Sequence, residues 1–193
     1  MAVSIKSARE IELMREAGKR LAHVHQELEA MIAPGISTWE IDAKGEKLIR
    51  DCGCIPNFLH YNGYPASICV SVNDEVVHGI PRKDRYLKEG DIVSLDAGLI
   101  YKGYHSDAAR TWAVGNVSPE AQKLMDVTKQ CFYEGIKFAK AGNHLNDIST
   151  AIQAYAEKFG YGVVRELVGH GIGTHLHDCL LYTSPSPRDG ATS

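Results

Sequence analysis

The sequence predicts an α+β domain, because helical and strand patterns mix along the chain without strict alternation and one antiparallel hairpin is included. Its 193 residues suffice for one domain of ordinary size. Hydrophobic residues make up 44% and charged residues 23%, which is the balance of a globular protein that folds in water. Length, composition and the mixture of elements therefore favour a single globular α+β domain.

Two helices are predicted near the N-terminus, each opened by a capping box. Ser7–Glu10 is the first box, and apolar residues then recur at helical spacing as far as Met31. Pro34-Gly35 ends this helix. Ser37–Glu40 is the second box, and its helix is predicted to reach about Gly53.

The remaining elements follow from alternation and from helix-start signals. A tight turn at Lys102-Gly103 joins two of the predicted strands into a hairpin. A helix is predicted from Ser118, where Ser and Pro supply the cap and first residue, and another from Asn146 to near Gly160. Strands are predicted at residues 67–73, 91–100, 104–114 and 162–168.

The hairpin places two aspartates close together. With Lys102-Gly103 as a two-residue turn, Asp96 faces Ala109, and Asp107 is its diagonal neighbour on the same face. Diagonal neighbours lie about 7–8 Å apart. Two carboxylates in an apolar setting repel unless a cation lies between them or one takes a proton. Aspartate is depleted in strands, so the pair is either a site or part of a solvated face, and the hairpin alone does not decide.

Two histidines stand beside glycines at predicted strand ends. His170 lies in the run 169–173, where glycines allow close backbone approach, and His78 lies in the similar run 76–81. His170 would complete a carboxylate-rich metal site, but a loop histidine in a Gly-rich turn is the reading that the motif alone favours. His175 and His177 follow closely, and one of them would reach the same cleft.

Composition excludes several classes of function. The formal net charge of −3 does not indicate binding to nucleic acid or to an anionic membrane. We find no signal peptide and no apolar run long enough for a membrane span. The five cysteines have no framework spacing, so reduced thiols and a cytoplasmic location are predicted. Cys52 and Cys54 lack a second pair that would complete four ligands of a metal.

Taken together, five segments make the chain resemble the type I methionine aminopeptidases, in that family's order and spacing. The segments are residues 65–73, 77–81, 90–96, 104–107 and 169–173. The likeness covers residues 1 to about 178, and the short N-terminal part fits the bacterial short form. Asn62 resembles the variant of Gram-positive bacteria, where others carry His. The resemblance implies the pita-bread fold, incomplete in its second half.

The resemblance also implies a dinuclear metal centre. The family binds two divalent ions through two Asp, one His and two Glu, and Asp96, Asp107 and His170 match the first three. Oxygen-rich ligation with one imidazole suits Mn, Fe or Co. The chain has no glutamate after Glu166 to match the two Glu ligands, one of which is also the general base. We therefore expect this chain itself to be inactive and poorly folded.

By the same resemblance, the function is metal-dependent removal of the initiator methionine from nascent proteins whose second residue is small. His78 matches a histidine that contacts the substrate near the scissile bond, and His177 one that steadies the tetrahedral intermediate. Proximity to the ribosome and a monomeric state of the complete protein are expected. The residues that match the family's methionine pocket are Phe58, Tyr61, Tyr64, Cys69 and Leu176. Together with the two histidines they form the predicted substrate-binding set.

The C-terminal stretch differs from the rest. Residues 1–178 are assigned to the partial catalytic domain and residues 179–193 to a disordered tail, which is rich in chain breakers and lacks apolar periodicity. The tail resembles a translated transposase-type sequencing adapter, so a gene fragment read through into adapter is our hypothesis. A natural truncation with a disordered tail is the alternative.

Two other functions are compatible with parts of the sequence. An Xaa-Pro aminopeptidase or prolidase shares the fold, but the segments 65–73 and 78–81 argue against it. Some relatives that have lost metal ligands act as binding proteins without catalysis, whereas Asp96, Asp107 and His170 are all present in this chain. The retained ligands favour an enzyme lineage.

Overall fold

A computed structural model describes residues 5–178 of the chain, which divide into two compact units. The larger unit contains residues 5–118 and 172–178, and the smaller contains residues 119–171. The predicted structureless tail falls on residues 179–193, outside the described residues. No helix in the described part of the chain is long and apolar enough to cross a membrane.

The larger unit begins with two helices, as predicted. Helix α1 spans Ala8–Glu29 and helix α2 spans Thr38–Asp51. Both begin in complete capping boxes, in which the serine hydroxyl accepts from the third helical N–H and the glutamate accepts from the serine N–H. In each helix one stripe is buried and the opposite side is exposed, so one stripe of each faces the sheet.

The sheet of this unit is antiparallel and has β3 (Ile92–Tyr101) at its centre. One edge of β3 pairs with β4 (Tyr104–Ala113) along its whole length. The other edge pairs with β2 (Ile68–Val72) and, further along, with the short β1 (Ile55–Pro56). Lys102 and Gly103 both have positive φ, which confirms the predicted two-residue turn.

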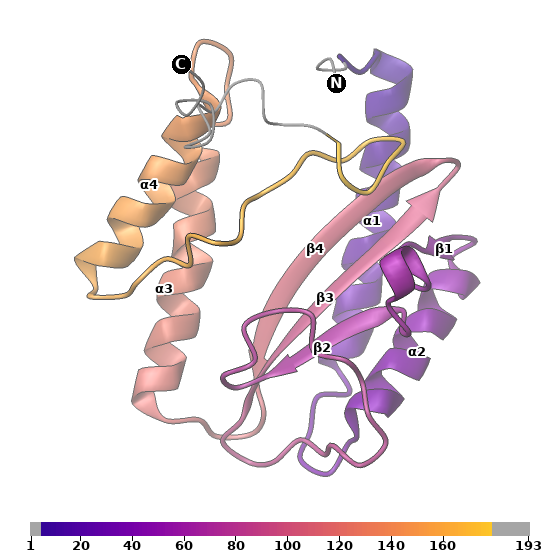
Figure 1. The fold of residues 1–193 in the computed structure, drawn as a ribbon, viewed down its shortest axis with the longest axis vertical. Coiled ribbons are helices and arrows are strands. Elements are labelled where there is room, and N and C mark those ends of the chain that lie inside the picture. Colours follow the sequence, from indigo (N-terminus) through magenta and orange to yellow (C-terminus); the bar gives the residue numbers. More distant parts are fainter. Residues whose placement is uncertain (1–4, 179–193) are drawn as a thin grey trace, which may run out of the picture. The chain divides into compact units, whose positions relative to one another are not determined.

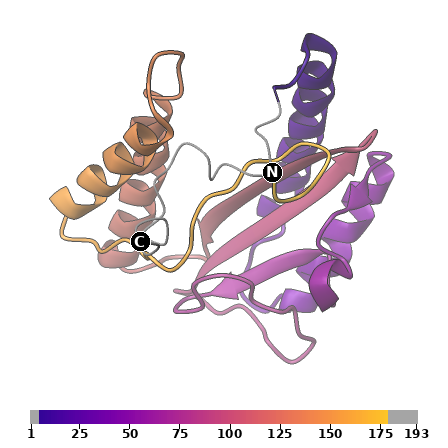
Figure 2. The ribbon, with the colours of Figure 1, turned by 45° about the horizontal axis from the view of Figure 1, so that its top comes forward.

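Helices α1 and α2 cover one face of this sheet (Figure 1). Helix α1 packs on β3 and β4, and α2 packs on β2 and β1. The core between these layers contains buried apolar side chains such as Leu21, Ile49, Val72 and Leu95. A single turn of 3-10 helix, Tyr61–Gly63, and the segment 172–178 lie outside this core. The segment 172–178 runs beside β4, as Figure 2 shows.

The smaller unit consists of helix α3 (Pro119–Ile136) packed antiparallel on helix α4 (Leu145–Lys158) (Figure 1). Helix α4 begins slightly earlier than predicted, because His144 is the N-cap and Asp147 completes its capping box. The strand predicted at 162–168 is wrong: these residues are irregular. A strand is stabilised by hydrogen bonds to a neighbouring strand, and the described part of this unit offers only helices.

Candidate active site

Two carboxylates meet on the central hairpin. In the register of β3 and β4, Asp96 pairs with Ala109 and Gly98 pairs with Asp107. The two aspartates are therefore diagonal neighbours on one face, as the turn predicted. Both are partly buried. The sheet thus presents two carboxylates at one point from adjacent strands.

The electrostatics of this pair favour a shared cation. Burial is the main cause that raises the pKa of Asp96, followed by the negative charge of Asp107 and a hydrogen bond between the two. Two neighbouring carboxylates do not both ionise readily in such a place unless a proton or a cation compensates them. Divalent Mn, Fe and Co ions accept carboxylate oxygens as ligands. The donor set therefore fits a divalent metal ion.

A small apolar cluster lies next to the carboxylates. Phe58, Cys69 and Leu176 are buried against one another, and the half-buried ring of Tyr64 packs against them. This cluster is separate from the main core between helices and sheet. Four of the residues that the family resemblance assigns to a methionine pocket thus come together, although Leu176 is distant from the others in sequence.

Strand pairing fixes the distance between this cluster and the acidic pair. Cys69 of β2 pairs directly with Asp96 of β3. Burial raises the pKa of the Cys69 thiol to about 11, and the nearby charges of Asp96 and Asp107 act in the same direction. The thiol is therefore protonated at neutral pH and acts as a small apolar wall. The Tyr64 hydroxyl lies 3.0 Å from the carbonyl oxygen of Gly79, to which it donates.

Tyr61 and His177 pair at the exposed rim of the cluster. The Tyr61 hydroxyl lies 2.9 Å from Nδ1 of His177. The two rings are also stacked, with centroids 5.5 Å apart and planes inclined by 29°. His177 directly follows the buried Leu176, so the segment that closes the cluster also brings this imidazole to its edge.

His78 lies in a strained position beside β2. Its φ of 59° is in the left-handed region, which is uncommon for a residue other than glycine. The next residue, Gly79, approaches β2 so closely that a Cβ would lie 2.2 Å from the carbonyl oxygen of Val70. Val70 donates its N–H to the Gly79 carbonyl. His78 is exposed, and its assignment to the substrate remains a prediction.

His170 belongs to the smaller unit, whereas the aspartates belong to the larger one. It is exposed, and its Nδ1 lies 3.0 Å from the carbonyl oxygen of Gly171. Its ligand role therefore stays a prediction. Among residues 5–178, no three His, Cys, Asp or Glu side chains gather closely enough to hold a metal ion. What the structure assembles is the pair Asp96 and Asp107.

Two residues near the pair were not predicted from the sequence. Nδ2 of the buried Asn57 lies 3.3 Å from Nδ1 of His105, and Asn57 also contacts the backbone at Ser106. Burial lowers the pKa of His105, and the neighbouring His175 lowers it further. The sequence offers only an asparagine directly before Phe58 as a signal, because the burial that makes its amide require partners is visible only in the structure.

Comparison with known proteins shows the family and the fold of the chain. The model of metallopeptidase family M24 matches residues 12–192. The methionine aminopeptidase of Clostridium acetobutylicum is 52% identical over 176 residues, which cover 91% of this chain and 70% of that protein. The crystal structure of methionine aminopeptidase from Rickettsia prowazekii is 38% identical with a TM-score of 0.90, over 92% of this chain and 71% of that one.

Solved structures from another branch of the fold are more distant. The Xaa-Pro dipeptidase from Bacillus anthracis is 28% identical with a TM-score of 0.75, and the match covers 91% of this chain and 48% of that chain. Identity is thus clearly higher to the methionine aminopeptidases than to this Xaa-Pro enzyme. The neighbours confirm the predicted α+β pita-bread fold, of which this chain spans about 70%.

Proposed function

The chain belongs to metallopeptidase family M24 and, within it, to the methionine aminopeptidases; from this premise we propose that its site removes the N-terminal methionine of polypeptides whose second residue is small. The observation that carries the proposal is the direct pairing of Cys69 with Asp96. That pairing places an apolar cluster beside a pair of carboxylates suited to a cation. A side chain held in the cluster would present its own backbone carbonyl to the acidic pair.

Asp96 and Asp107 would hold the metal ions of the site, with His170 as the third ligand. We propose two ions of Mn, Fe or Co. Divalent ions bound there would supply Lewis-acid polarisation of a carbonyl and a lowered pKa for water. Because the chain has no glutamate after Glu166, it lacks matches for two further carboxylate ligands. We propose that the 193-residue chain is inactive, whereas its larger unit, which is compact and has an apolar core of its own, keeps the cluster that binds methionine.

The rim residues would act on the substrate itself. When the Tyr61 hydroxyl donates to Nδ1 of His177, the imidazole proton is on Nε2, which would then donate to the oxygen of a tetrahedral intermediate. His78 would contact the peptide near the scissile bond. As part of the same proposal, the protein is located in the cytoplasm and works close to the ribosome. The complete protein is a monomer.

The cluster itself limits which first residue is accepted. Phe58, Cys69, Leu176 and Tyr64 present rings, a neutral thiol and a branched alkyl group, a lining that suits an uncharged, flexible thioether. A charged side chain would lose its hydration there without gaining a counter-ion from these four residues. The same reasoning predicts that norleucine, which replaces sulfur by CH₂, is accepted.

A cleavage assay tests the proposal. The active form for this assay is a chimaera in which the C-terminal segment of the Clostridium acetobutylicum relative replaces residues 179–193. With Mn²⁺ it should release methionine from Met-Ala-Ser and leave Ala-Pro-Ser intact. The 193-residue chain is the matched control and should release nothing. Faster cleavage of Ala-Pro-Ser than of Met-Ala-Ser would favour the Xaa-Pro alternative and contradict the proposal.

A further inference from the structure

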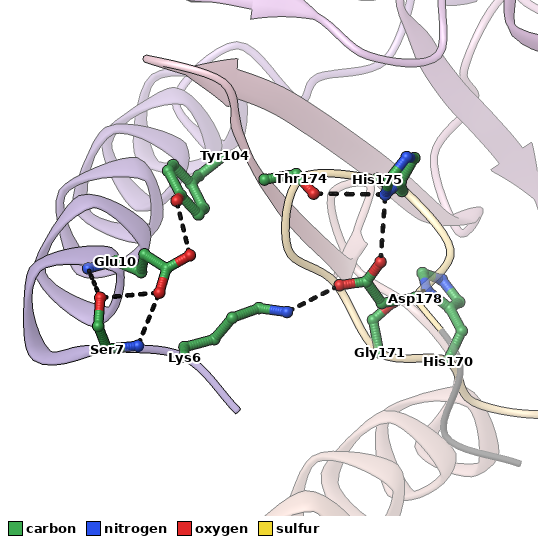
Figure 3. Close-up of polar contacts among 9 residues, drawn as sticks. All are labelled: Lys6, Ser7, Glu10, Tyr104, His170, Gly171, Thr174, His175 and Asp178. Carbon is green, nitrogen blue, oxygen red and sulfur yellow. Dashed lines mark hydrogen bonds and ion pairs between the residues drawn. The ribbon is translucent and has the colours of Figure 1, made fainter. Parts of the chain in front are cut away.

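The segment that closes the apolar cluster is attached to the rest of the larger unit at two places, once on strand β4 and once just before helix α1. The first attachment is a backbone hydrogen bond of 2.8 Å, in which the N–H of His105 on β4 donates to the carbonyl of Gly173. The second is an ion pair of 3.0 Å between Nζ of Lys6 and the carboxylate of Asp178 (Figure 3). Leu176 and His177 lie between these two attachments in sequence.

The ion pair is packed onto the segment and does not project into solvent. The side chains of Lys6 and Asp178 are only 17% and 25% exposed. A Cβ on Gly173 would lie 2.3 Å from the Asp178 carboxylate and 2.8 Å from Nζ of Lys6. Gly173 itself is buried. The pair therefore rests directly on the residue that forms the backbone attachment, and only glycine leaves room for it there.

The N-terminal end of the pair is also fixed. Ser7, the residue after Lys6, opens the capping box of α1, and Glu10 of that box accepts a hydrogen bond of 2.9 Å from the Tyr104 hydroxyl on β4 (Figure 3). Lys6 thus projects from a segment anchored to the same strand that binds Gly173. At its other end, Asp178 also lies 3.5 Å from Nδ1 of His175.

We propose that the Lys6–Asp178 ion pair is a positioning latch, which holds residues 172–178 on the sheet and so sets the position of Leu176 over Cys69. Lys6 and Asp178 do not touch the substrate. They act through Leu176 and His177, and they determine how tightly the apolar cluster closes. The description of this cluster as a methionine pocket rests on the proposed function, whereas the latch itself does not.

The rate at which Cys69 reacts with a thiol reagent measures how often the segment 172–178 opens. Cys69 is 4% exposed and belongs to the same buried cluster as Leu176, so opening of the segment should expose it to iodoacetamide. Cys54 is 5% exposed in the main core of the same unit and serves as an internal control for general loosening. The rates at both thiols are measured on the 193-residue chain by peptide mass spectrometry at one fixed pH.

Lys6→Met and Asp178→Asn should each accelerate modification of Cys69 roughly two- to fivefold, which is the range expected for a partly exposed ion pair. The double variant should modify Cys69 no faster than either single variant. Lys6→Arg, which keeps the positive charge, should leave the rate as slow as in the unmodified chain. The two single variants change the local charge in opposite directions, so a rise in both reports opening of the segment and not an altered thiol pKa. Gly173→Ala, which displaces the pair, should act in the same direction.

Lys19→Met is the matched control, because it removes an ion pair with Glu16 on α1 that does not contact the segment. It should leave the Cys69 rate unchanged. An unchanged Cys69 rate in Lys6→Met and Asp178→Asn would overturn the latch, and so would an equal acceleration at Cys54. Added L-methionine should slow Cys69 modification; failure of that arm alone would count against the proposed function and leave the latch standing.

Discussion

Cys69 pairs with Asp96 across the β2–β3 interface, so an apolar pocket wall and a candidate metal ligand are neighbours in one sheet. The neighbouring strand contributes Asp107 from the diagonal position. Backbone hydrogen bonds therefore set the distance between the apolar cluster and the acidic pair. A rigid sheet is a suitable support for such a site, because small displacements of catalytic groups have large effects on rate.

The first prediction concerns Asp107. Asp107→Asn in the chimaera should lower kcat/KM by more than roughly a hundredfold, because changes to groups that merely support a metal ligand already cost ten- to a hundredfold. Titration calorimetry with Mn²⁺ should show weaker binding in the same variant. Asp126→Asn, an exposed change on α3, is the control. Unchanged Mn²⁺ affinity in Asp107→Asn would contradict the ligand assignment.

The second prediction separates substrate contact from metal binding. His78→Ala should lower kcat on the order of a hundredfold, since loss of a group that positions the peptide near the scissile bond misaligns the reacting atoms. Its Mn²⁺ affinity should equal that of the unmodified chimaera. Loss of Mn²⁺ in His78→Ala would show instead that this histidine is a ligand.

The third prediction concerns the first residue of the substrate. The chimaera should cleave norleucine-Ala-Ser with a loss of less than roughly tenfold relative to Met-Ala-Ser, because norleucine nearly matches methionine in shape. Lys-Ala-Ser should not be cleaved measurably. Competition between the three peptides in one reaction gives the ratio of kcat/KM values. Efficient cleavage of the lysine peptide would refute the apolar pocket.

The fourth prediction concerns the pH dependence of stability at the start of α1. Hydrogen bonds from the Ser7 backbone, the Ser7 hydroxyl and the Tyr104 hydroxyl lower the pKa of Glu10 from 4.5 to about 2. A lowered pKa in the folded state stabilises the protein above pH 4.5, and this contribution is lost as the pH falls from 4.5 toward 2.

Urea denaturation checks this contribution. The difference in unfolding midpoint between the unmodified chain and Glu10→Gln should be largest at pH 7 and should shrink at pH 3. Glu12→Gln, which affects only an exposed pair with Arg15, should show a smaller difference at pH 7. An equal difference between the unmodified chain and Glu10→Gln at both pH values would contradict the role of the ionised Glu10.

Local signals explain why much of the fold was predictable from the sequence. Capping boxes, helical periodicity and a two-residue turn each act within a few residues, and together they gave α1, α2 and the register that brings Asp96 and Asp107 together. The short β1 was missed, because two residues carry no alternation. The strand expected at 162–168 failed because a pattern of residues does not reveal whether a neighbouring strand is present.

The pocket and the latch depend on long-range contacts that local patterns do not encode. The approach of Leu176 to Phe58 and Cys69 was expected only through resemblance to a family, and the structure confirms that these three pack together. The ion pair of Lys6 with Asp178 was not predicted at all. Charged residues near both ends of a domain have many candidate partners, and only the fold selects one.

The central claim is that the cluster of Phe58, Cys69, Leu176 and Tyr64 receives a methionine side chain beside the acidic pair. The most direct measurement is the rate at which iodoacetamide modifies Cys69 in the 193-residue chain with increasing L-methionine, with L-lysine as the matched control. Methionine should slow modification of Cys69 in a saturable way, lysine should not, and Cys54 should be unaffected by either. An unchanged Cys69 rate with methionine, or equal protection by lysine, would contradict the central claim.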